Sequence, residues 1–400
     1  MSFTKFLQAA LLLLVGLAAV PSGWAQTYTV LYTFEGGRDG AYPFAGVVQD
    51  SAGNLYGTTI GANVGGLEGS VFKVVPSGGF TVLHSFKYGG AGGARPGPLV
   101  QDSAGNLYGT TAGWGTSPPT IFKVTKTGRF SVLHTYTSGS GAGGTLTLDS
   151  VGNLYGAGGD NTACGGHGCG LIFKLDPSGN ETVLHYFPGG KRGTGPNGGL
   201  IRDAAGNLYG TTAFGGLYHH GIVFKLDPAG NETVLYSFKA EPDGSQPNGD
   251  LIRDGAGNFY GTTVWGGQGR CQGISCGVVF KLDTNGNETV LHSFTGGADG
   301  GNPVAGLVMD SAGNLYGTTV VGGGPPSCLY DTCGVVFKLD PSGTETVLHT
   351  FDYRNPTPGV GPEAGVILDS AGNVYGTTSL GGDYPDCQTG GCGVVFKITP

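Results

Sequence analysis

The chain has 400 residues and a formal net charge of −8, from 20 Lys and Arg against 28 Asp and Glu. This excess of negative charge disfavours nucleic acid as a partner. Glycine and proline contribute 82 and 22 residues, a share that would indicate disorder if it had no period, but here the glycines recur at fixed points of a repeat.

The first 25 residues have the pattern of a secretory signal. Lys5 precedes an apolar run from Ala9 to Val20, and small residues follow as far as Ala25. The run is shorter than the roughly 20 apolar residues that a membrane helix needs, and no later segment reaches that length. We therefore expect cleavage near Ala25 and an exported protein, extracellular or periplasmic, without a membrane span.

One ten-residue phrase, DSAGNLYGTT at 50–59, returns almost intact six more times. Each copy of the surrounding unit contains four short apolar stretches between turn signals. In the fifth copy these stretches are 249–254, 258–263, 277–283 and 288–294. Four strands per unit, at a period of about 50 residues, are typical of a propeller blade.

The connections within and between the copies differ in length. The first and second strands of a copy, and the third and fourth, are joined by tight Gly-containing turns such as 254–258 and 283–287. The link from second to third strand and the link between copies are longer and variable. Because alternate hairpin ends of an up-and-down sheet lie on opposite faces, we expect a long-link face, which carries both kinds of long link, and a tight-turn face opposite it.

The two ends of the chain complement each other. Residues 28–34 read as a fourth strand without its blade, and residues 392–400 end in a third strand without its partner. Pairing 28–34 with 394–399 would remove two exposed sheet edges. We predict that residues 26–400 form one all-β domain, a monomeric seven-bladed β-propeller with four strands per blade, closed by the N-terminal strand.

The order A-G-L-V-x-D-S-A-G-N-L-Y-G-T-T, followed by G-V-V-F-K-L-D-P-S-G-N-E-T-V-L-H-S-F, resembles the GloVer tandem-repeat family of exported bacterial proteins. The phrase D-x-x-G-N-x-Y is more distantly similar to NHL-type propellers. The resemblance covers residues 28–399. It implies the fold and the export, but it implies no activity.

The eight cysteines form four C-x-x-x-x-C pairs, all in links between second and third strands. The pairs are Cys164 with Cys169, Cys271 with Cys276, Cys328 with Cys333, and Cys387 with Cys392. An even count in an exported chain favours local disulfides. Zinc sites are the alternative, since His167 lies inside the first pair, but they would join cysteines of different blades and expose thiolates to oxidation.

Several polar residues recur at the same position in every copy. Five histidines share one slot of the fourth strand with Tyr32 and Tyr236, namely His84, His134, His185, His292 and His349. We interpret this slot as packing with a polar tip, and the Asp of the repeated phrase as turn chemistry. Asp39, Asp243 and Asp299, each four residues before a Pro, also indicate turns, with calcium-stabilised loops as the alternative.

Departures from the repeat cluster around the fourth and fifth copies. The candidate binding residues there are Phe214, Tyr218, His219, His220, Asp243, Asn248, Asp250, Trp265 and Arg270, and Trp114 adds an aromatic ring in another copy. Flat aromatic faces suit sugar rings, and the polar groups suit directional hydrogen bonds. In the alternative interpretation, Phe214 and Trp265 only cap the blades, because their slot is shared with Val321 and Leu380.

Asp250 stands where the other copies have Gly46, Pro98, Thr145, Gly199, Gly306 and Gly365. An innermost strand normally keeps small residues there, so a carboxylate facing the channel is unusual, although a wet channel would tolerate it. Asn197, Asn248, Asp250 and Glu363 all begin inner strands and are candidate calcium ligands near the axis. We expect no other cofactor.

Three functions fit this pattern, in this order of preference. The first is a noncatalytic binding module for a carbohydrate or cell-surface polymer, and the second is a scaffold that binds an envelope protein. The third is a metal-assisted propeller hydrolase or lactonase, or a carboxylate-driven glycosidase or lyase. An enzyme is the least favoured, because the sequence has no clustered inner-strand carboxylates, no G-x-S-x-G and no H-E-x-x-H.

Overall fold

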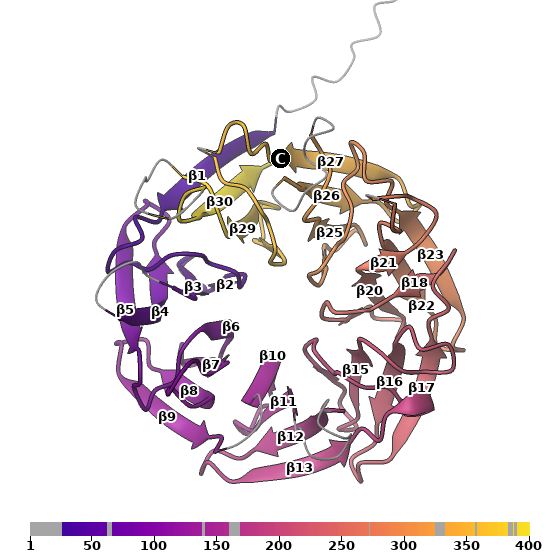
Figure 1. Cartoon of the computed structure of the whole chain (residues 1–400), viewed down its shortest axis with the longest axis horizontal. Coiled ribbons are helices and arrows are strands. Elements are labelled where there is room, and N and C mark those ends of the chain that lie inside the picture. The colour runs from indigo at the N-terminus through magenta and orange to yellow at the C-terminus, as the bar shows by residue number, and fades with distance from the viewer. Residues whose placement is uncertain are drawn as a thin grey trace, which may run out of the picture.

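The computed structural model describes residues 26–61, 66–137, 141–159, 169–271, 273–324, 333–356, 358–382, 387 and 390–400. Seven four-stranded antiparallel sheets surround a central axis (Figure 1). The described residues contain no α-helix and one 3₁₀ turn, η1 (Gly190–Arg192). The predicted seven-bladed all-β propeller is confirmed.

The first four blades follow one another along the chain. Blade 1 comprises β2 (Val48–Gln49), β3 (Leu55–Thr59), β4 (Leu67–Val74) and β5 (Phe80–Lys87). Blade 2 comprises β6 (Pro96–Gln101), β7 (Leu107–Thr111), β8 (Thr120–Val124) and β9 (Phe130–Thr135). Blade 3 comprises β10 (Gly141–Leu148), β11 (Leu154–Gly159), β12 (Leu171–Leu175) and β13 (Glu181–Tyr186). Blade 4 comprises β14 (Ile201–Arg202), β15 (Leu208–Thr212), β16 (Ile222–Leu226) and β17 (Glu232–Ser237).

The second half of the ring continues this order. Blade 5 comprises β19 (Ile252–Arg253), β20 (Phe259–Thr263), β22 (Val278–Leu282) and β23 (Glu288–Ser293). Blade 6 comprises β24 (Val308–Met309), β25 (Leu315–Thr318), β26 (Val335–Leu339) and β27 (Glu345–Thr350). Blade 7 comprises β28 (Ile367–Leu368), β29 (Val374–Thr378), β30 (Val394–Thr399) and β1 (Thr27–Thr33).

The N-terminal strand closes the ring as predicted. β1 is antiparallel to β30, with Thr27 opposite Thr399 and Thr33 opposite Val394. In Figure 1 the indigo β1 lies on the outer side of the yellow β30. Every blade therefore has four strands, and no outer edge of blade 7 is left without its partner strand.

Five of the seven inner strands are only two residues long, shorter than the sequence predicts, whereas β6 and β10 are longer. The expected strand 249–254 is reduced to β19, Ile252–Arg253. The residues before it approach the next blade instead, since a Cβ on Gly249 would lie 2.5 Å from the carbonyl oxygen of Ala305. This close approach around the axis explains the small residues at the start of most inner strands.

The repeated phrase builds the tight turn between the first two strands. Asp254 Oδ1 accepts hydrogen bonds from the backbone N–H groups of Ala256 and Asn258, and Oδ2 accepts from Asn258 Nδ2 and the hydroxyl of Tyr260. The carboxylate makes the same contacts with Asn and Tyr in the other six copies. The phrase is thus part of the frame.

The hydrophobic core lies between neighbouring blades. Phe294, at the end of the fourth strand of blade 5, is fully buried and contacts Phe337 of blade 6 edge-to-face, with 5.2 Å between ring centroids. Equivalent phenylalanine pairs join five other boundaries, namely Phe34–Phe72, Phe86–Phe122, Phe187–Phe224, Phe238–Phe280 and Phe351–Phe396. Each such pair contributes about 0.5–1.5 kcal/mol beyond its buried area.

The second glycine of the repeated phrase leaves space for the buried phenylalanine rings between the blades. Gly261 is opposite Phe280 in the sheet, and a Cβ at Gly261 would lie 2.8 Å from the ring of Phe280. A side chain at this position would displace the ring. Gly261 lies within β20 and not in the turn, so packing against Phe280 is what requires a glycine here.

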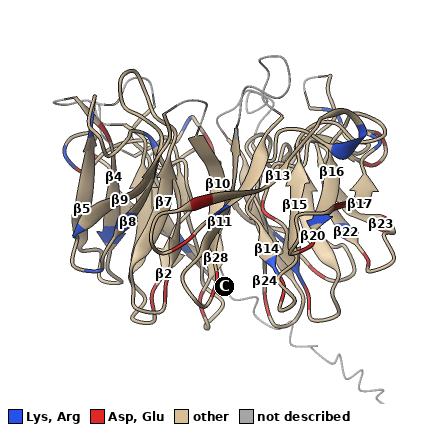
Figure 2. Ribbon diagram, turned by 90° about the horizontal axis from the view of Figure 1, so that it is seen from below, with Lys and Arg blue, Asp and Glu red and all other residues tan. Residues whose placement is uncertain are grey.

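The long links gather on one face of the ring, and Figure 2 shows the blades from the side with both faces in view. An unpredicted two-stranded sheet ties the two kinds of long link together in blade 5, where β18 (Gly244–Ser245) pairs with β21 (Trp265–Gly266). Single bridges do the same in other blades, at Ala41–Gly61, Thr194–Phe214, Gly301–Val321 and Val360–Leu380.

The disulfide prediction is confirmed for the described cysteines. Cys271 is bonded to Cys276, and Cys387 is bonded to Cys392. Cys169 and Cys333 are also disulfide-bonded, while their expected partners Cys164 and Cys328 lie outside the described residues. No free cysteine occurs in the described part of the chain, which is consistent with an exported protein.

Candidate functional site

The first candidate region is a cavity of about 360 Å³ on the propeller axis. Its lining is mostly glycine, alanine and valine from the starts of the inner strands. The four predicted calcium candidates, Asn197, Asn248, Asp250 and Glu363, all line it. Their common location is as the sequence predicts, and their role as ligands stays a prediction.

Hydrogen bonds within the protein hold both carboxylates of the cavity. Asp250 accepts a hydrogen bond from the backbone N–H of Gly199 in blade 4, and Glu363 Oε1 accepts one from Ser379 Oγ at 3.0 Å. By contrast, Asn248 Oδ1 is buried and has no hydrogen-bond partner among the described residues. The protein therefore leaves one buried amide oxygen of a cavity-lining residue without a hydrogen bond.

The second region joins the long links of blades 4 and 5. His220 Nδ1 lies 3.0 Å from the hydroxyl of Ser245, and Ser245 pairs with Trp265 in the β18–β21 sheet. The indole Nε1 of Trp265 donates to Gln246 Oε1 at 3.1 Å. These contacts bring His220 and Trp265 together through the link between the blades, and they leave Trp265 partly buried.

Phe214 and Tyr218, in the same link as His220, are exposed to solvent. The ring of Phe214 is 48% exposed, whereas Val321, in the equivalent slot of blade 6, is 2% exposed. The blade-capping interpretation thus fits Val321 but not Phe214. His219 is also exposed and adopts a left-handed backbone conformation, with φ of 67°, which is uncommon for a residue other than glycine.

The two charged candidates of this sector are placed differently. Arg270 is exposed and makes a bidentate pair with Glu241, at 2.7 and 2.9 Å. Asp243 is buried, and its carboxylate accepts from the hydroxyl of Tyr236 at 2.7 Å and the backbone N–H of Lys239 at 3.1 Å. The contacts of Asp243 match the turn interpretation, and a ligand contact by it stays a prediction.

Trp114 belongs to blade 2 and has a partner that the sequence analysis missed. The guanidinium carbon of Arg95 lies 3.5 Å from the centre of the Trp114 ring. The tryptophan is still 48% exposed. Arg95 is in the link before blade 2, and no local pattern in the sequence pairs that link with the loop that carries Trp114.

The partners of the histidine slot were not predicted from the sequence. A residue at the start of the fourth strand in one blade, the first residue or in β1 the second, contacts the slot residue of the blade before it. An imidazole lies beside a carboxylate at His134–Glu181, His185–Glu232 and His292–Glu345. Two rings are stacked at Tyr32–Phe80, His84–Phe130 and Tyr28–His349. Comparing the Glu of each E-T-V triplet with the slot of the preceding copy would have shown this pairing.

Exposed large hydrophobic side chains are concentrated on the long-link face. Among the described residues, eight of the twelve lie in long links, namely Phe44, Tyr88, Trp114, Phe214, Leu217, Tyr218, Ile274 and Tyr353. Three others lie on outer strands, and Val151 lies in a tight turn. Among the described residues, the long-link face therefore carries most of the exposed large hydrophobic side chains.

Solved structures show the same fold at low sequence identity. The extracellular domain of what is described as a one-component system from B. thetaiotaomicron matches with a TM-score of 0.55 at 15% identity over 93% of this chain. This chain spans 40% of the length of that protein. At such identity the likeness shows the fold alone.

Two enzymes are weaker structural matches. A gluconolactonase from Xanthomonas campestris has a TM-score of 0.45 at 14% identity, over 94% of this chain and 89% of that one. A luciferin-regenerating enzyme has a TM-score of 0.47 at 16% identity, over 76% of this chain and 91% of that one. No curated protein matches the chain.

Within the described residues, no helix is long and apolar enough to cross a membrane. The profile of the Gloeobacter/Verrucomicrobia repeat matches residues 21–166 and 144–389, which together include nearly all of the propeller. The chain therefore belongs to the Gloeobacter/Verrucomicrobia repeat family.

Proposed function

We propose that this protein is an exported, noncatalytic binding module that takes up a carbohydrate or cell-surface polymer on its long-link face. One observation carries the proposal: most of the exposed large hydrophobic side chains lie in long links, and the tight turns contribute a single valine among the described residues. The strands and tight turns repeat around the ring, whereas the residues of the long-link face differ from blade to blade.

The chemistry of the face suits sugar rings. Phe214, Tyr218 and Trp114 expose flat aromatic surfaces, on which the apolar faces of pyranose rings stack. Arg270 with Glu241, and His219, supply exposed polar groups for hydrogen bonds to hydroxyls. Aromatic rings on both blade 2 and blade 4 favour a polymer over a single sugar.

Co-sedimentation with insoluble cellulose, chitin and peptidoglycan tests the proposal. The double variant Phe214→Ala with Tyr218→Ala is compared with Val151→Ala, which removes an exposed hydrophobic side chain from the tight-turn face. We expect at least one polymer to bind, a fivefold or greater weakening in the double variant, and no change in the control. Equal retention of the double variant and the control would refute an aromatic binding face.

The axial cavity supports a second candidate, a metal-assisted hydrolase or lactonase. Asn197, Asn248, Asp250 and Glu363 place four oxygen-bearing side chains around one cavity, and such oxygens suit calcium. This function requires calcium-dependent hydrolysis of a lactone, lost in Glu363→Gln and in Asp250→Asn. Hydrolysis that is unaffected by chelator and by both substitutions would exclude the cavity as its site.

A further inference from the structure

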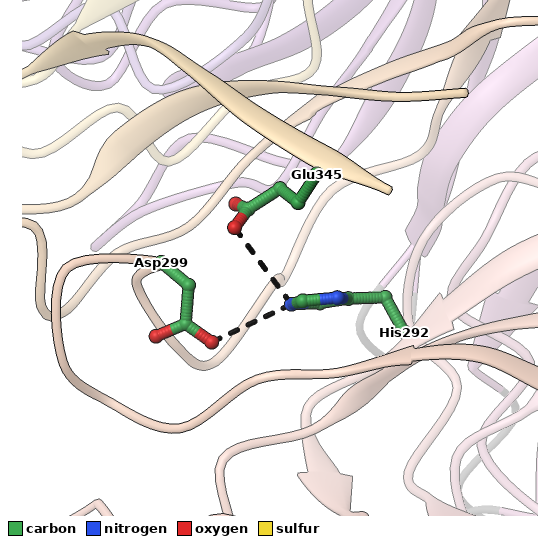
Figure 3. A group of neighbouring side chains, drawn as sticks. All are labelled: His292, Asp299 and Glu345. Atoms are coloured by element: carbon green, nitrogen blue, oxygen red, sulfur yellow. Dashed lines mark ion pairs between the residues drawn. The ribbon is translucent and has the colours of Figure 1, made fainter. Parts of the chain in front are cut away.

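Three side chains from three separate segments meet at the boundary between blades 5 and 6 (Figure 3). His292 is on β23, Asp299 is in the link that follows it, and Glu345 is the first residue of β27. One ligand atom from each, an imidazole nitrogen or a carboxylate oxygen, lies within 4.8 Å of the other two.

The separations within this cluster are longer than hydrogen bonds. His292 Nε2 lies 3.4 Å from Asp299 Oδ2 and 3.9 Å from Glu345 Oε2, whereas N–H···O hydrogen bonds measure about 2.7–3.2 Å. Ligand atoms that share one tetrahedral zinc ion, each about 2.0–2.2 Å from it, lie about 3.3–3.6 Å apart. Small side-chain shifts would bring all three atoms within reach of one ion.

Two polar atoms of the cluster are buried without a partner. Among the described residues, His292 Nε2 and Glu345 Oε1 make no hydrogen bond. The side chains of His292, Asp299 and Glu345 are only 18%, 15% and 10% exposed. Burying two carboxylates beside one imidazole is costly, and a divalent cation would balance the carboxylate charge and use the lone pair of His292 Nε2, which makes no hydrogen bond.

Asp299 is held in place for this contact. Its Oδ2 accepts a hydrogen bond from the backbone N–H of Thr295 at 2.7 Å, and its Oδ1 accepts one from the hydroxyl of the same residue. A carboxylate oxygen with one such bond keeps a lone pair for a metal. The link thus presents Asp299 toward His292 in a fixed orientation.

The other six boundaries lack one or more of these ligands. At the equivalent positions they have Tyr32, Asp39 and Phe80; His84, Ala91 and Phe130; His185, Arg192 and Glu232; and Tyr236, Asp243 and Glu288. Glu181 beside His134 has no acidic third residue, and His349 faces Tyr28. Arg192 neutralises Glu232 directly, at 2.8 Å. At these positions, only the boundary between blades 5 and 6 combines an imidazole with two carboxylates.

We infer that His292, Asp299 and Glu345 form a binding site for one first-row divalent transition-metal ion, best matched by zinc, which clamps blade 5 to blade 6. One nitrogen and two oxygens suit zinc, while calcium prefers oxygen ligands alone. Three protein ligands leave a fourth position for water. The site is independent of the proposed carbohydrate-binding face and of the axial cavity.

Isothermal titration calorimetry with zinc chloride tests this site, using untagged protein of residues 26–400 that has been stripped with chelator. We expect one saturable site, and at least a tenfold loss of affinity in His292→Tyr, which introduces the residue found at Tyr236 in the preceding blade. The matched control is His185→Tyr, because Arg192 replaces the second acid there. This control should bind zinc like the unchanged protein.

Cobalt provides a second readout of the same site. A tetrahedral cobalt complex has strong visible absorption, which we expect in the unchanged protein and not in Asp299→Asn or Glu345→Gln. If His292→Tyr does not fold, these two variants decide the question. Zinc affinity that survives all three substitutions, or that is lost instead in a His219→Ala and His220→Ala double variant, would overturn the inference, as would the absence of saturable binding.

Discussion

The imidazole of His84 lies flat against the ring of Phe130 across the boundary between blades 1 and 2, with 3.7 Å between the ring centroids. Two boundaries further on, the same slot places His185 3.1 Å from a carboxylate oxygen of Glu232. One position of the repeat therefore joins blades by ring stacking or by an imidazole–carboxylate contact, depending on the residue that the next blade supplies.

Substituting His84 with Phe should remove a pH-dependent loss of stability. Burial lowers the pKa of His84 from 6.5 to about 4. Between pH 6.5 and pH 4 this histidine is therefore protonated in the unfolded chain but neutral in the folded protein. The free energy of unfolding is highest above pH 6.5 and decreases as the pH falls toward 4. His84→Phe retains a ring beside Phe130 without this titration, so its unfolding free energy should fall less between pH 7 and pH 4.5. Identical losses in urea titrations of both proteins would disprove this.

Replacing Glu288 with Gln should stabilise the protein most at alkaline pH. Burial, and secondarily the nearby carboxylate of Asp243, raises the pKa of Glu288 to about 7. The unfolded chain, with a pKa of about 4.3, loses this proton before the folded protein does. The contribution of Glu288 to the free energy of unfolding is therefore full below about pH 4.3 and is lost as the pH rises through 7. We expect Glu288→Gln to raise the urea midpoint at pH 8 by more than at pH 4.5. A gain that does not depend on pH would contradict this cause.

The Asp of the repeated phrase should contribute more to the free energy of unfolding than the Asp of the other tight turn, because its side chain accepts an additional hydrogen bond from a tyrosine. Asp254→Ala leaves Asn258 and the hydroxyl of Tyr260 without their shared acceptor, at a cost of about 1–3 kcal/mol. Asp283→Ala, in the other tight turn of the blade, is the control, because Asp283 accepts from Asn287 but from no tyrosine. Urea denaturation should show the larger loss for Asp254→Ala. A larger loss for Asp283→Ala would argue against the tyrosine contact.

The Cys271–Cys276 disulfide should make only a modest contribution to stability. It closes a short loop, with a sequence separation of 5, and the chain-entropy model gives roughly 2 kcal/mol for so few residues. Replacing both cysteines with alanine should lower the free energy of unfolding by about that amount and preserve the β-sheet circular dichroism spectrum. Loss of the fold would show that the bond organises blade 5 rather than only its link.

The architecture was predictable from sequence because repetition exposes it. Seven copies of one phrase give the blade number, and the unpaired segments 28–34 and 394–399 give the closure. Contacts between blades were harder to predict, because they join residues about 50 positions apart whose types change from copy to copy. His292, Asp299 and Glu345 each looked like an ordinary repeat residue, and only their meeting in space makes a cluster.

The candidate binding face was predicted only in part. Phe214 and Tyr218, which the variable links supply, have exposed rings, since departures from a repeat are free of its packing constraints, and ligand binding by them stays a prediction. Asp243 was also a candidate of this sector, yet it is buried and accepts hydrogen bonds from Tyr236 and Lys239. Exposure of a single side chain depends on how a long link folds back, which no local pattern reports.

Tryptophan fluorescence tests the central claim most directly, because the only tryptophans of residues 26–400 are Trp114 and Trp265, both in long links. Protein of residues 26–400 would be titrated with soluble glucans, pectins, chitin oligomers and peptidoglycan fragments. The proposed binding module predicts a saturable change in emission with at least one of them, reduced in Trp265→Phe or Trp114→Phe. Unchanged emission with every polymer, together with no retention on the insoluble ones, would contradict a carbohydrate-binding face.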